Sequence, residues 1–423
     1  MYVLNLTLCI VIFILQFMQN KVLSSASLWT FYYFCFFVIS PFLLNYHDDL
    51  ADEYGLVGIL LYFVGYIVMS GIIYSNKKLG KYASKSIITN DKNLKILERV
   101  RINIRLLFAM MLVMMLLYIG TSGITSIISS SATTTKLFAS DEGIKSIDLF
   151  TYFKAATGYA MVYLFILKEG KYEVKDWIIL SVWIIFYLFF SFTRADLVFV
   201  IGMLIAYRCK NINRFKQLFI CMAGILLLVL VMNFMMFLRV YGIEKSLNMI
   251  DIEVYLLSLA NNLDFPIVYR SFASLVQNDI SINPLVYFKV LYAFIPRSFW
   301  PEKPLRGSIE IIKELDYSSY VNGISTGYTI LGLPFAVFGI LGIILGPFIW
   351  GMITVYFDNW YDEKIKNNSL TSIKVFLYWY FSMVFILQCF REGTDVAILN
   401  LPFIFIILYT VRYFDIKKIK FKN

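Results

Sequence analysis

Long apolar runs recur along the whole of this chain and constrain its fold more than any other feature. The candidate membrane spans lie at about 3–19, 27–45, 55–74, 105–120, 149–167, 177–193, 195–207, 216–238, 328–356, 374–390 and 396–411. Hydrophobic residues make up 60% of the 423 and charged residues only 16%, so a soluble domain of this size has too little polar surface to cover its core. The sequence therefore predicts an all-α polytopic membrane protein with about 11 transmembrane helices (10–12).

Positive charge is distributed unevenly between the connecting segments, and this predicts how the chain lies in the membrane. Segment 77–105 alone holds nine Lys and Arg residues, so we expect it on the cytoplasmic side. Alternating from there, the inner segments hold 25 of the 38 basic residues and nine of the 28 acidic ones. The net charge of +10 thus follows from membrane orientation and gives no support to nucleic-acid binding.

The gaps between the runs divide the chain into three parts. Residues 1–238 form a predicted transmembrane bundle with about eight spans, and residues 239–327 form the one long external loop. Residues 328–423 contain the last spans and a basic cytoplasmic tail. Within the loop, apolar periodicity predicts short helices that lie at the membrane interface.

Several classes of chemistry lack their sequence signals. The five cysteines have no paired spacing, and His47 is the single histidine, so neither a disulfide framework nor a metal centre is predicted. The chain has no P-loop, no GxGxxG, no GxSxG and no HExxH motif. We therefore expect no cofactor and no mechanism driven by cytosolic nucleotides.

Two arginines lie in short turns between apolar runs. Arg194, in SFTRAD, precedes a run of about 13 residues that covers roughly 20 Å as a helix, less than the ~30 Å hydrocarbon core. Arg391, in CFREGTDVAI, precedes a run of about 16 residues, roughly 24 Å long. Such turns are drawn below the membrane surface, where an ionisable side chain is a candidate functional group. The structural alternative is a simple anchor, in which Arg194 pairs with Asp196, and Arg391 with Glu392 or Asp395.

The external loop contains a stiff, basic and aromatic stretch, AFIPRSFWPEKPLRGS, at 293–308. Prolines at 296, 301 and 304 would hold Arg297 and Trp300 on a fixed, non-helical backbone. Guanidinium groups suit pyrophosphate oxygens, and flat aromatic rings suit the apolar faces of sugars. The alternative is a belt that binds lipid headgroups, but three prolines in nine residues are more than a belt requires. The loop's candidate binding residues are Arg239, Arg270, Arg306, Lys303, Trp300 and Tyr292.

The first outer loop, NYHDDLADEYG at 45–55, is acidic. Its carboxylates and His47 have the chemistry of a divalent-ion site or a general base. Their spacing is not diagnostic, and an outer loop is expected to lack Lys and Arg in any case. We therefore favour a solvated acidic loop.

Four segments resemble the O-antigen polymerase family, the oligosaccharide repeat-unit polymerases of bacterial surface polysaccharides. IPRSFWPEKP (295–304) is similar to that family's Pro-Arg-x-x-Trp-Pro-x-Lys-Pro segment, SFTRADLVFVI (191–201) to its arginine turn between central spans, and CFREGTDVAIL (389–399) to the turn before its last span. LGLPFAVFGILGIILGPFIWG (331–351) is similar to its Phe-Gly-x-x-Gly span. The pattern departs where an acidic residue is expected, because Leu333 stands near that place.

The resemblance implies a fold like that of class C membrane glycosyltransferases and a reaction on the outer face of the cytoplasmic (inner) membrane. A growing glycan on undecaprenyl pyrophosphate would be transferred to a new lipid-linked repeat unit, with an active site on the periplasmic or extracellular side. Arg194, Arg297 and Arg391 would bind the pyrophosphate, while Trp300 and Tyr292 would stack on sugar. The candidates for the general base are Glu302, Glu310, Asp264, Asp395 and His47. Expected partners are the lipid-linked oligosaccharide, membrane lipids, and a chain-length regulator and flippase of the same pathway.

Three other readings stay open at this point. A lipid-linked oligosaccharide flippase or another transporter would place ionisable residues near the bilayer midplane, whereas here the runs are almost free of charge. A ligase would move finished glycan onto a different acceptor. A structural scaffold for the polysaccharide machinery would tolerate loss of Arg297.

Overall fold

The computed structural model describes residues 2–19, 23–79, 91–122, 144–190, 195–210, parts of 212–233, 263–292, 299–300, 302–321, 327–366 and 371–413. Throughout these ranges the regular structure is helical, with no strand. Five helices in the described part are long and apolar enough to cross a membrane: Ser25–Leu44, Asp49–Ser75, Ile340–Ile365, Ser372–Arg391 and Thr394–Tyr413. The structure therefore fits an all-α membrane protein, while the full number of spans stays a prediction.

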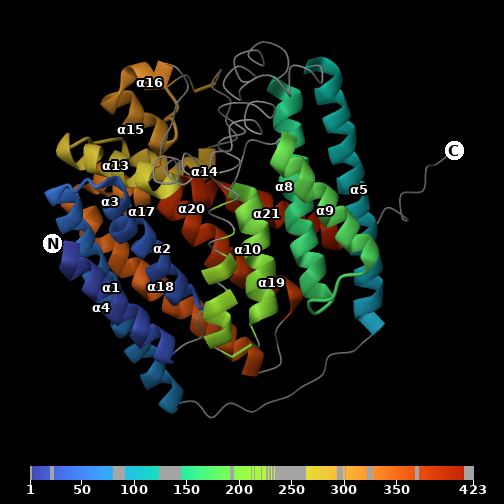
Figure 1. The fold of residues 1–423 in the computed structure, drawn as a ribbon, viewed down its shortest axis with the longest axis horizontal. Helices are drawn as coiled ribbons and strands as arrows, with labels where there is room; N and C mark the ends of the chain where they lie inside the picture. Colours follow the sequence, from blue (N-terminus) through green and yellow to red (C-terminus); the bar gives the residue numbers. More distant parts are fainter. Residues whose placement is uncertain are drawn as a thin grey trace.

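One group of helices combines residues 2–79 with residues 329–366. It contains α1 (Tyr2–Gln19), α2 (Ser25–Phe34), the π-helix η1 (Cys35–Ile39), α3 (Ser40–Leu44), α4 (Asp49–Leu79), α17 (Thr329–Phe338) and α18 (Ile340–Lys366). Helices α4 and α18 run side by side (Figure 1). Tyr62 of α4 stacks on Trp29 of α2 at 3.7 Å, and its hydroxyl lies 3.2 Å from the Thr354 hydroxyl of α18. Aromatic stacking therefore joins helices that are far apart in sequence.

The second group packs around the long apolar helix Ser372–Arg391. It contains α5 (Asp91–Ser122), α8 (Ile144–Leu167), α9 (Val174–Phe190), α10 (Ala195–Cys209), α19 (Ser372–Tyr380), the π-helix η3 (Phe381–Phe385), α20 (Ile386–Arg391) and α21 (Thr394–Tyr413). Helix α8 packs against α5, α10, α19 and α21. The aromatic rings of α8 and α19 meet in this core, for example Tyr159 on Tyr380 at 5.8 Å.

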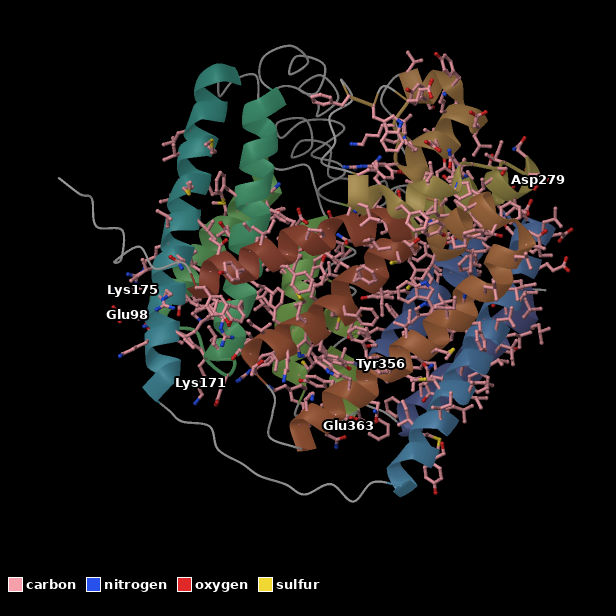
Figure 2. All side chains as sticks on the ribbon, turned by 180° about the vertical axis from the view of Figure 1, so that it is seen from behind. Glu98, Lys171, Lys175, Asp279, Tyr356 and Glu363 are labelled. Carbon is pink, nitrogen blue, oxygen red and sulfur yellow. The ribbon has the colours of Figure 1, made fainter. Side chains whose placement is uncertain are left out.

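A layer of short helices lies over one end of this bundle, which we call the cap end (Figure 1). The layer consists of α13 (Asp264–Gln277), the 3-10 helix η2 (Pro284–Phe288), α14 (Lys289–Tyr292), α15 (Gly307–Leu315) and α16 (Tyr317–Val321). Figure 2 shows Asp279 at this end, and Lys171 and Glu363 at the opposite end. The described parts of the two segments that charge assigns to opposite sides of the membrane, residues 91–105 and 263–321, thus lie towards opposite ends of the bundle.

Candidate functional site

The turn between α20 and α21 lies at the cap end, where other segments of the chain contact it. Helix α20 ends at Arg391, Gly393 has a φ of +103°, and α21 begins at Thr394. Arg391 Nη1 donates to Glu392 Oε1 at 2.8 Å, so one of the two anchoring pairs expected from sequence exists. Arg391 remains partly exposed, with 27% of its side chain accessible. The guanidinium is therefore held by an acidic neighbour while part of the side chain stays accessible to solvent.

Asp395 connects this turn to the cap layer. Its Oδ2 accepts a hydrogen bond from the backbone N–H of Gly307, the first residue of α15, at 2.9 Å. The side chain is only 2% exposed, and among the described residues its Oδ1 has no hydrogen-bond partner. The positive charges of Lys289 and Arg306 act on the carboxyl. Asp395 thus fixes α15 over the end of the bundle.

A second backbone segment closes on the same turn. At Gly327, two residues before α17, a Cβ atom would stand 1.4 Å from the carbonyl oxygen of Arg391. Only glycine permits so close an approach. The turn 391–395 is therefore enclosed by the start of α15 and by the segment that enters α17.

Trp300, in the described part of the proline-rich stretch, packs against a neighbouring aromatic ring. The Trp300 ring packs on Tyr292 at 5.1 Å, and Tyr292 donates its hydroxyl proton to the carbonyl of Leu285 at 2.7 Å. Lys303 Nζ lies 6.0 Å from the Tyr292 ring centroid. Tyr292 is buried, so Trp300 is the more accessible ring of the pair. Stacking of either ring on sugar stays a prediction.

A cleft of about 440 Å³ opens beside this stretch. One wall is formed by residues 281–283 and another by residues 302–305. The remaining lining comes from Glu310, Lys313 and Glu314 of α15 and from Tyr320 of α16. The volume falls within the range of pockets that bind small organic ligands, roughly 300–1,000 Å³.

Glu310 is the partly buried carboxyl of this cleft. Its Oε1 accepts a hydrogen bond from the backbone N–H of Leu305 at 2.8 Å. Burial raises the pKa of Glu310 above its usual range, against the lowering effects of the Leu305 N–H, Lys289 and Lys313. The nearby Asp395 charge raises this pKa further. A carboxyl in this setting is suited to proton transfer nearer neutral pH.

The structure brings together many of the predicted site residues. Around the turn and the cleft lie Arg306, Arg391, Lys303, Trp300, Tyr292, Glu302, Glu310 and Asp395. Arg270 is exposed on α13 and takes no part in the contacts just described. Arg194, Arg239 and Arg297 lie outside the described residues, as does the side chain of Asp264.

The acidic first loop differs from the sequence expectation. Asp48 and Asp52 are 8% and 4% exposed, so the prediction of a solvated acidic loop is wrong for these two residues. Tyr269 of α13 donates to Asp52 Oδ1 at 2.6 Å, and Gln277 of α13 donates to Asp48. His47 Nδ1 lies 3.4 Å from Asp52 Oδ2. This loop is a latch that fastens α13 to the start of α4.

No group of His, Cys, Asp and Glu within the described ranges is arranged to hold a metal ion.

A buried lysine was missed by the sequence reasoning. Lys154 of α8 is 1% exposed, and its Nζ lies 4.1 Å from the ring centroid of Tyr187 in α9. The Tyr187 hydroxyl donates in turn to Asp196 of α10 at 3.0 Å. Asp196 and Glu392 both act electrostatically on Tyr159, so this group and the turn 391–395 share a neighbour in α8. A single charged residue inside an otherwise apolar run was the signal for it.

Comparison with protein-family models, with curated proteins and with solved structures finds no match to this chain. The function has to be inferred from the chemistry of the cap end.

Proposed function

We propose that this protein is a glycosyltransferase that polymerises undecaprenyl-pyrophosphate-linked repeat units on the outer face of the cytoplasmic membrane. The observation that carries the proposal is the concentration of partly exposed charge at one end of an apolar bundle. There, the turn 391–395 adjoins α15 through the hydrogen bond from Gly307 to Asp395, and α15 forms one wall of the cleft. Substrates with a lipid tail and a polar head require such a site at the membrane boundary.

Fixed cations near the membrane boundary can stabilise the negative charge of a departing diphosphate. As the bond from the anomeric carbon to the diphosphate oxygen breaks, negative charge develops on the leaving group, and preorganised cations lower this barrier. Arg391 is held by Glu392, and the positive charge of the exposed Arg306 acts on Asp395 of the same turn. We assign the same role to Arg194 and Arg297 from their sequence positions.

Glu310 is the general base that the geometry favours. It lines the cleft, is partly buried and has a raised pKa. Asp395 already accepts the Gly307 N–H and is buried, whereas His47 belongs to the latch with Asp52. In the step we propose, the acceptor hydroxyl oxygen bonds to the anomeric carbon and its proton passes to Glu310. The electron pair of the broken carbon–oxygen bond stays on the diphosphate.

Transport is the second candidate function, and Lys154 is the observation that favours it. A buried lysine facing an aspartate across a tyrosine ring is the kind of group that ion-coupled transporters use. Transporters, however, place such groups near the bilayer midplane. Asp196 is the second residue of α10 and, like Glu392 of the cap-end turn, acts on Tyr159, so this group lies towards one end of the bundle.

The deciding experiment uses purified protein in liposomes with lipid-linked repeat units as the only substrate. A polymerase yields a ladder of longer glycans, a flippase moves the substrate across the bilayer without lengthening it, and a ligase needs a different acceptor. Arg391→Ala, Arg194→Ala and Arg297→Ala are each expected to insert, fold and give no ladder. Arg101→Ala is the matched control and keeps the ladder, because Arg101 pairs with Glu173, which is close in sequence to Lys171 at the end opposite the cap (Figure 2). Wild-type polymer length from all three cap-end variants would refute the site assignment.

A further inference from the structure

The cleft beside the proline-rich stretch has walls that are fixed before any ligand binds. On one side, the Ile282 N–H donates to the carbonyl of Ala336 near the end of α17, at 2.8 Å. On the other side, the Leu305 N–H is held by Glu310 at 2.8 Å. Pro304 is buried between them and has a restricted backbone. A pocket that is already formed binds a ligand with little loss of conformational entropy.

The charges that line this cleft nearly cancel. The lining holds three glutamates, Glu302, Glu310 and Glu314, and two lysines, Lys303 and Lys313, so its formal charge is −1. A diphosphate would bring more negative charge into a site that is already slightly negative, which opposes its binding. Two cations suited to the diphosphate lie outside this lining: Arg391 belongs to the neighbouring turn, and Arg306 directly precedes α15 and acts electrostatically on Asp395.

The polar lining matches a ligand rich in hydroxyl groups. Carboxylates accept hydrogen bonds, lysines donate them, and the side chains of Ser281, Asn283 and Tyr320 can do both. A saccharide presents hydroxyls that donate and accept in alternation. Tyr320 adds an aromatic ring, which can cover the apolar face of a sugar.

We propose that this cleft is a subsite for the uncharged saccharide of the acceptor, separate from the arginines that bind diphosphate. The inference rests on the proposed function, and it names the part of the substrate that each region recognises. Glu310 belongs to both regions, because it lines the cleft and interacts electrostatically with Asp395 at the turn. The attacking hydroxyl of a saccharide bound in the cleft thus lies at the end nearest the turn.

Calorimetric binding with two separate probes tests this division. The probes are the lipid-free repeat-unit oligosaccharide, released by mild acid from the lipid-linked intermediates of the cells that make the protein, and inorganic pyrophosphate. Ser281→Trp fills the cleft from an exposed position, and Asn278→Trp is the matched control, three residues away and outside the lining. Glu314→Gln, also exposed, is a second and milder change to the cleft.

We expect Ser281→Trp to weaken oligosaccharide binding at least tenfold, or about 1.4 kcal/mol, and to leave pyrophosphate binding unchanged. Glu314→Gln should weaken the oligosaccharide less, and Asn278→Trp should match the wild type. Arg391→Ala should show the reverse pattern, with pyrophosphate affinity lost and oligosaccharide affinity kept. Unchanged oligosaccharide affinity in both cleft variants, or no oligosaccharide binding by a wild type that makes ladders, overturns the proposal.

The two proposals fail in different ways. A wild type that binds the oligosaccharide in the cleft and makes no ladder refutes the polymerase and leaves the subsite standing. A wild type that makes ladders, together with a Ser281→Trp variant whose KM for the acceptor is unchanged, refutes the subsite alone.

Discussion

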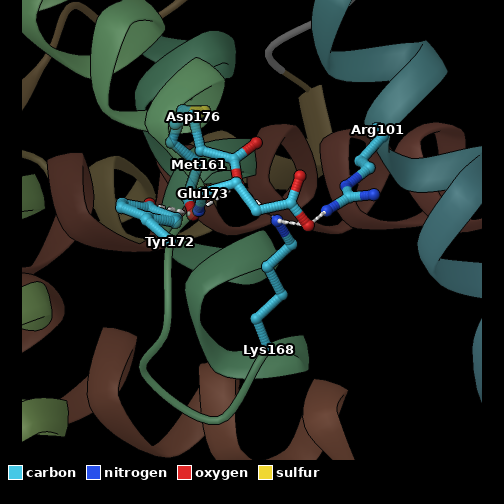
Figure 3. A network of polar contacts seen from close by, with 6 residues as sticks. All are labelled: Arg101, Met161, Lys168, Tyr172, Glu173 and Asp176. Carbon is cyan, nitrogen blue, oxygen red and sulfur yellow. Dashed lines mark hydrogen bonds and ion pairs between the residues drawn. The ribbon is translucent and has the colours of Figure 1, made fainter.

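The two ends of the bundle use charge in opposite ways. At the end away from the cap, Lys168 pairs with Asp176 and also lies 3.3 Å from Glu173, which pairs in turn with Arg101 (Figure 3). These pairs join α5, α8 and α9. At the cap end, charged groups instead line an open cleft or stand beside a turn that is only partly covered. Closed pairs position helices, whereas open groups of mixed charge leave room for a ligand.

Asp358 of α18 shows the same structural use of charge away from the cap. Its carboxylate accepts hydrogen bonds from the backbone N–H groups of Ser25 and Ala26 at 2.7 and 3.1 Å. Tyr378 donates a third bond to it at 2.8 Å. The first N–H groups of α2, which have no partner within their own helix, are therefore satisfied by a neighbouring helix. The carboxylate of Asp358 thus joins α18 to α2 and to Tyr378, which is a structural role.

The largest expected effect concerns Lys154, which combines burial with a position near the cap end. Lys154→Met removes the cation and leaves Asp196 with the Tyr187 hydroxyl as its remaining partner in this group. Lys154 is buried and Asp196 half-buried, and leaving one of two such interacting charges uncompensated costs up to about 3–5 kcal/mol. We expect a loss of that size in the free energy of unfolding, measured by denaturant titration in detergent micelles.

The double variant Lys154→Met with Asp196→Asn is the control for this pair. Removing both charges should restore most of the lost stability. If the double variant instead loses the sum of the two single effects, Lys154 and Asp196 act independently.

Glu310→Gln has the next largest expected effect. It tests through pH whether a charged group at the cap end takes part in the reaction. The amide keeps an acceptor for the Leu305 N–H but cannot take a proton from the acceptor hydroxyl. We expect ladder formation to slow by about 10²-fold, a typical effect for losing a general base. In the wild type the rate should rise with pH as Glu310 ionises, and the raised pKa places this rise above the usual carboxyl range. The variant should lose this rise.

The stability of the folded wild-type protein should fall as pH rises through the pKa of Glu310, whereas its reaction rate should rise. A carboxyl whose pKa is raised by folding keeps its proton to higher pH in the folded state, so the folded state loses stability as pH rises through that pKa. Glu310→Gln should therefore be at least as stable as the wild type at neutral pH. Glu302→Gln, which changes an exposed carboxylate of the same cleft, is the control and should retain the pH profile. A wild-type rate in Glu310→Gln would remove this residue from the reaction.

Tyr269→Phe tests the latch, a third use of charge at the cap end. The change removes the hydrogen bond to Asp52 Oδ1 and leaves a buried carboxylate oxygen without that donor. Leaving a buried acceptor unsatisfied costs about 1–3 kcal/mol. Thermal unfolding in detergent should show this loss. Ser271→Ala, a half-buried change that removes a hydrogen bond within α13, should lower the unfolding temperature much less.

Sequence alone could predict the helical class and the neighbourhood of the turn 391–395. The apolar runs became helices because length and composition decide this in lipid, and a charge directly after such a run indicated Arg391. The burial of Asp48 and Asp52 could not be predicted, because their partners on α13 are more than 200 residues away in the chain. The cleft is likewise formed by three segments that only tertiary packing brings together.

The smallest expected effect belongs to Arg101→Ala, at the end away from the cap. The Arg101 side chain is 25% exposed and its partner Glu173 is 61% exposed, so water already solvates much of this pair. Exposed pairs contribute little to stability, and we expect neither the unfolding temperature nor the ladder to change measurably. Lys168→Met should cost more stability, because Lys168 and Asp176 are each only 8% exposed, yet it too should leave glycan length unchanged in protein that folds. Loss of ladders from folded Arg101→Ala protein would mean that charge at both ends serves the reaction, and the contrast between the two ends would then be wrong.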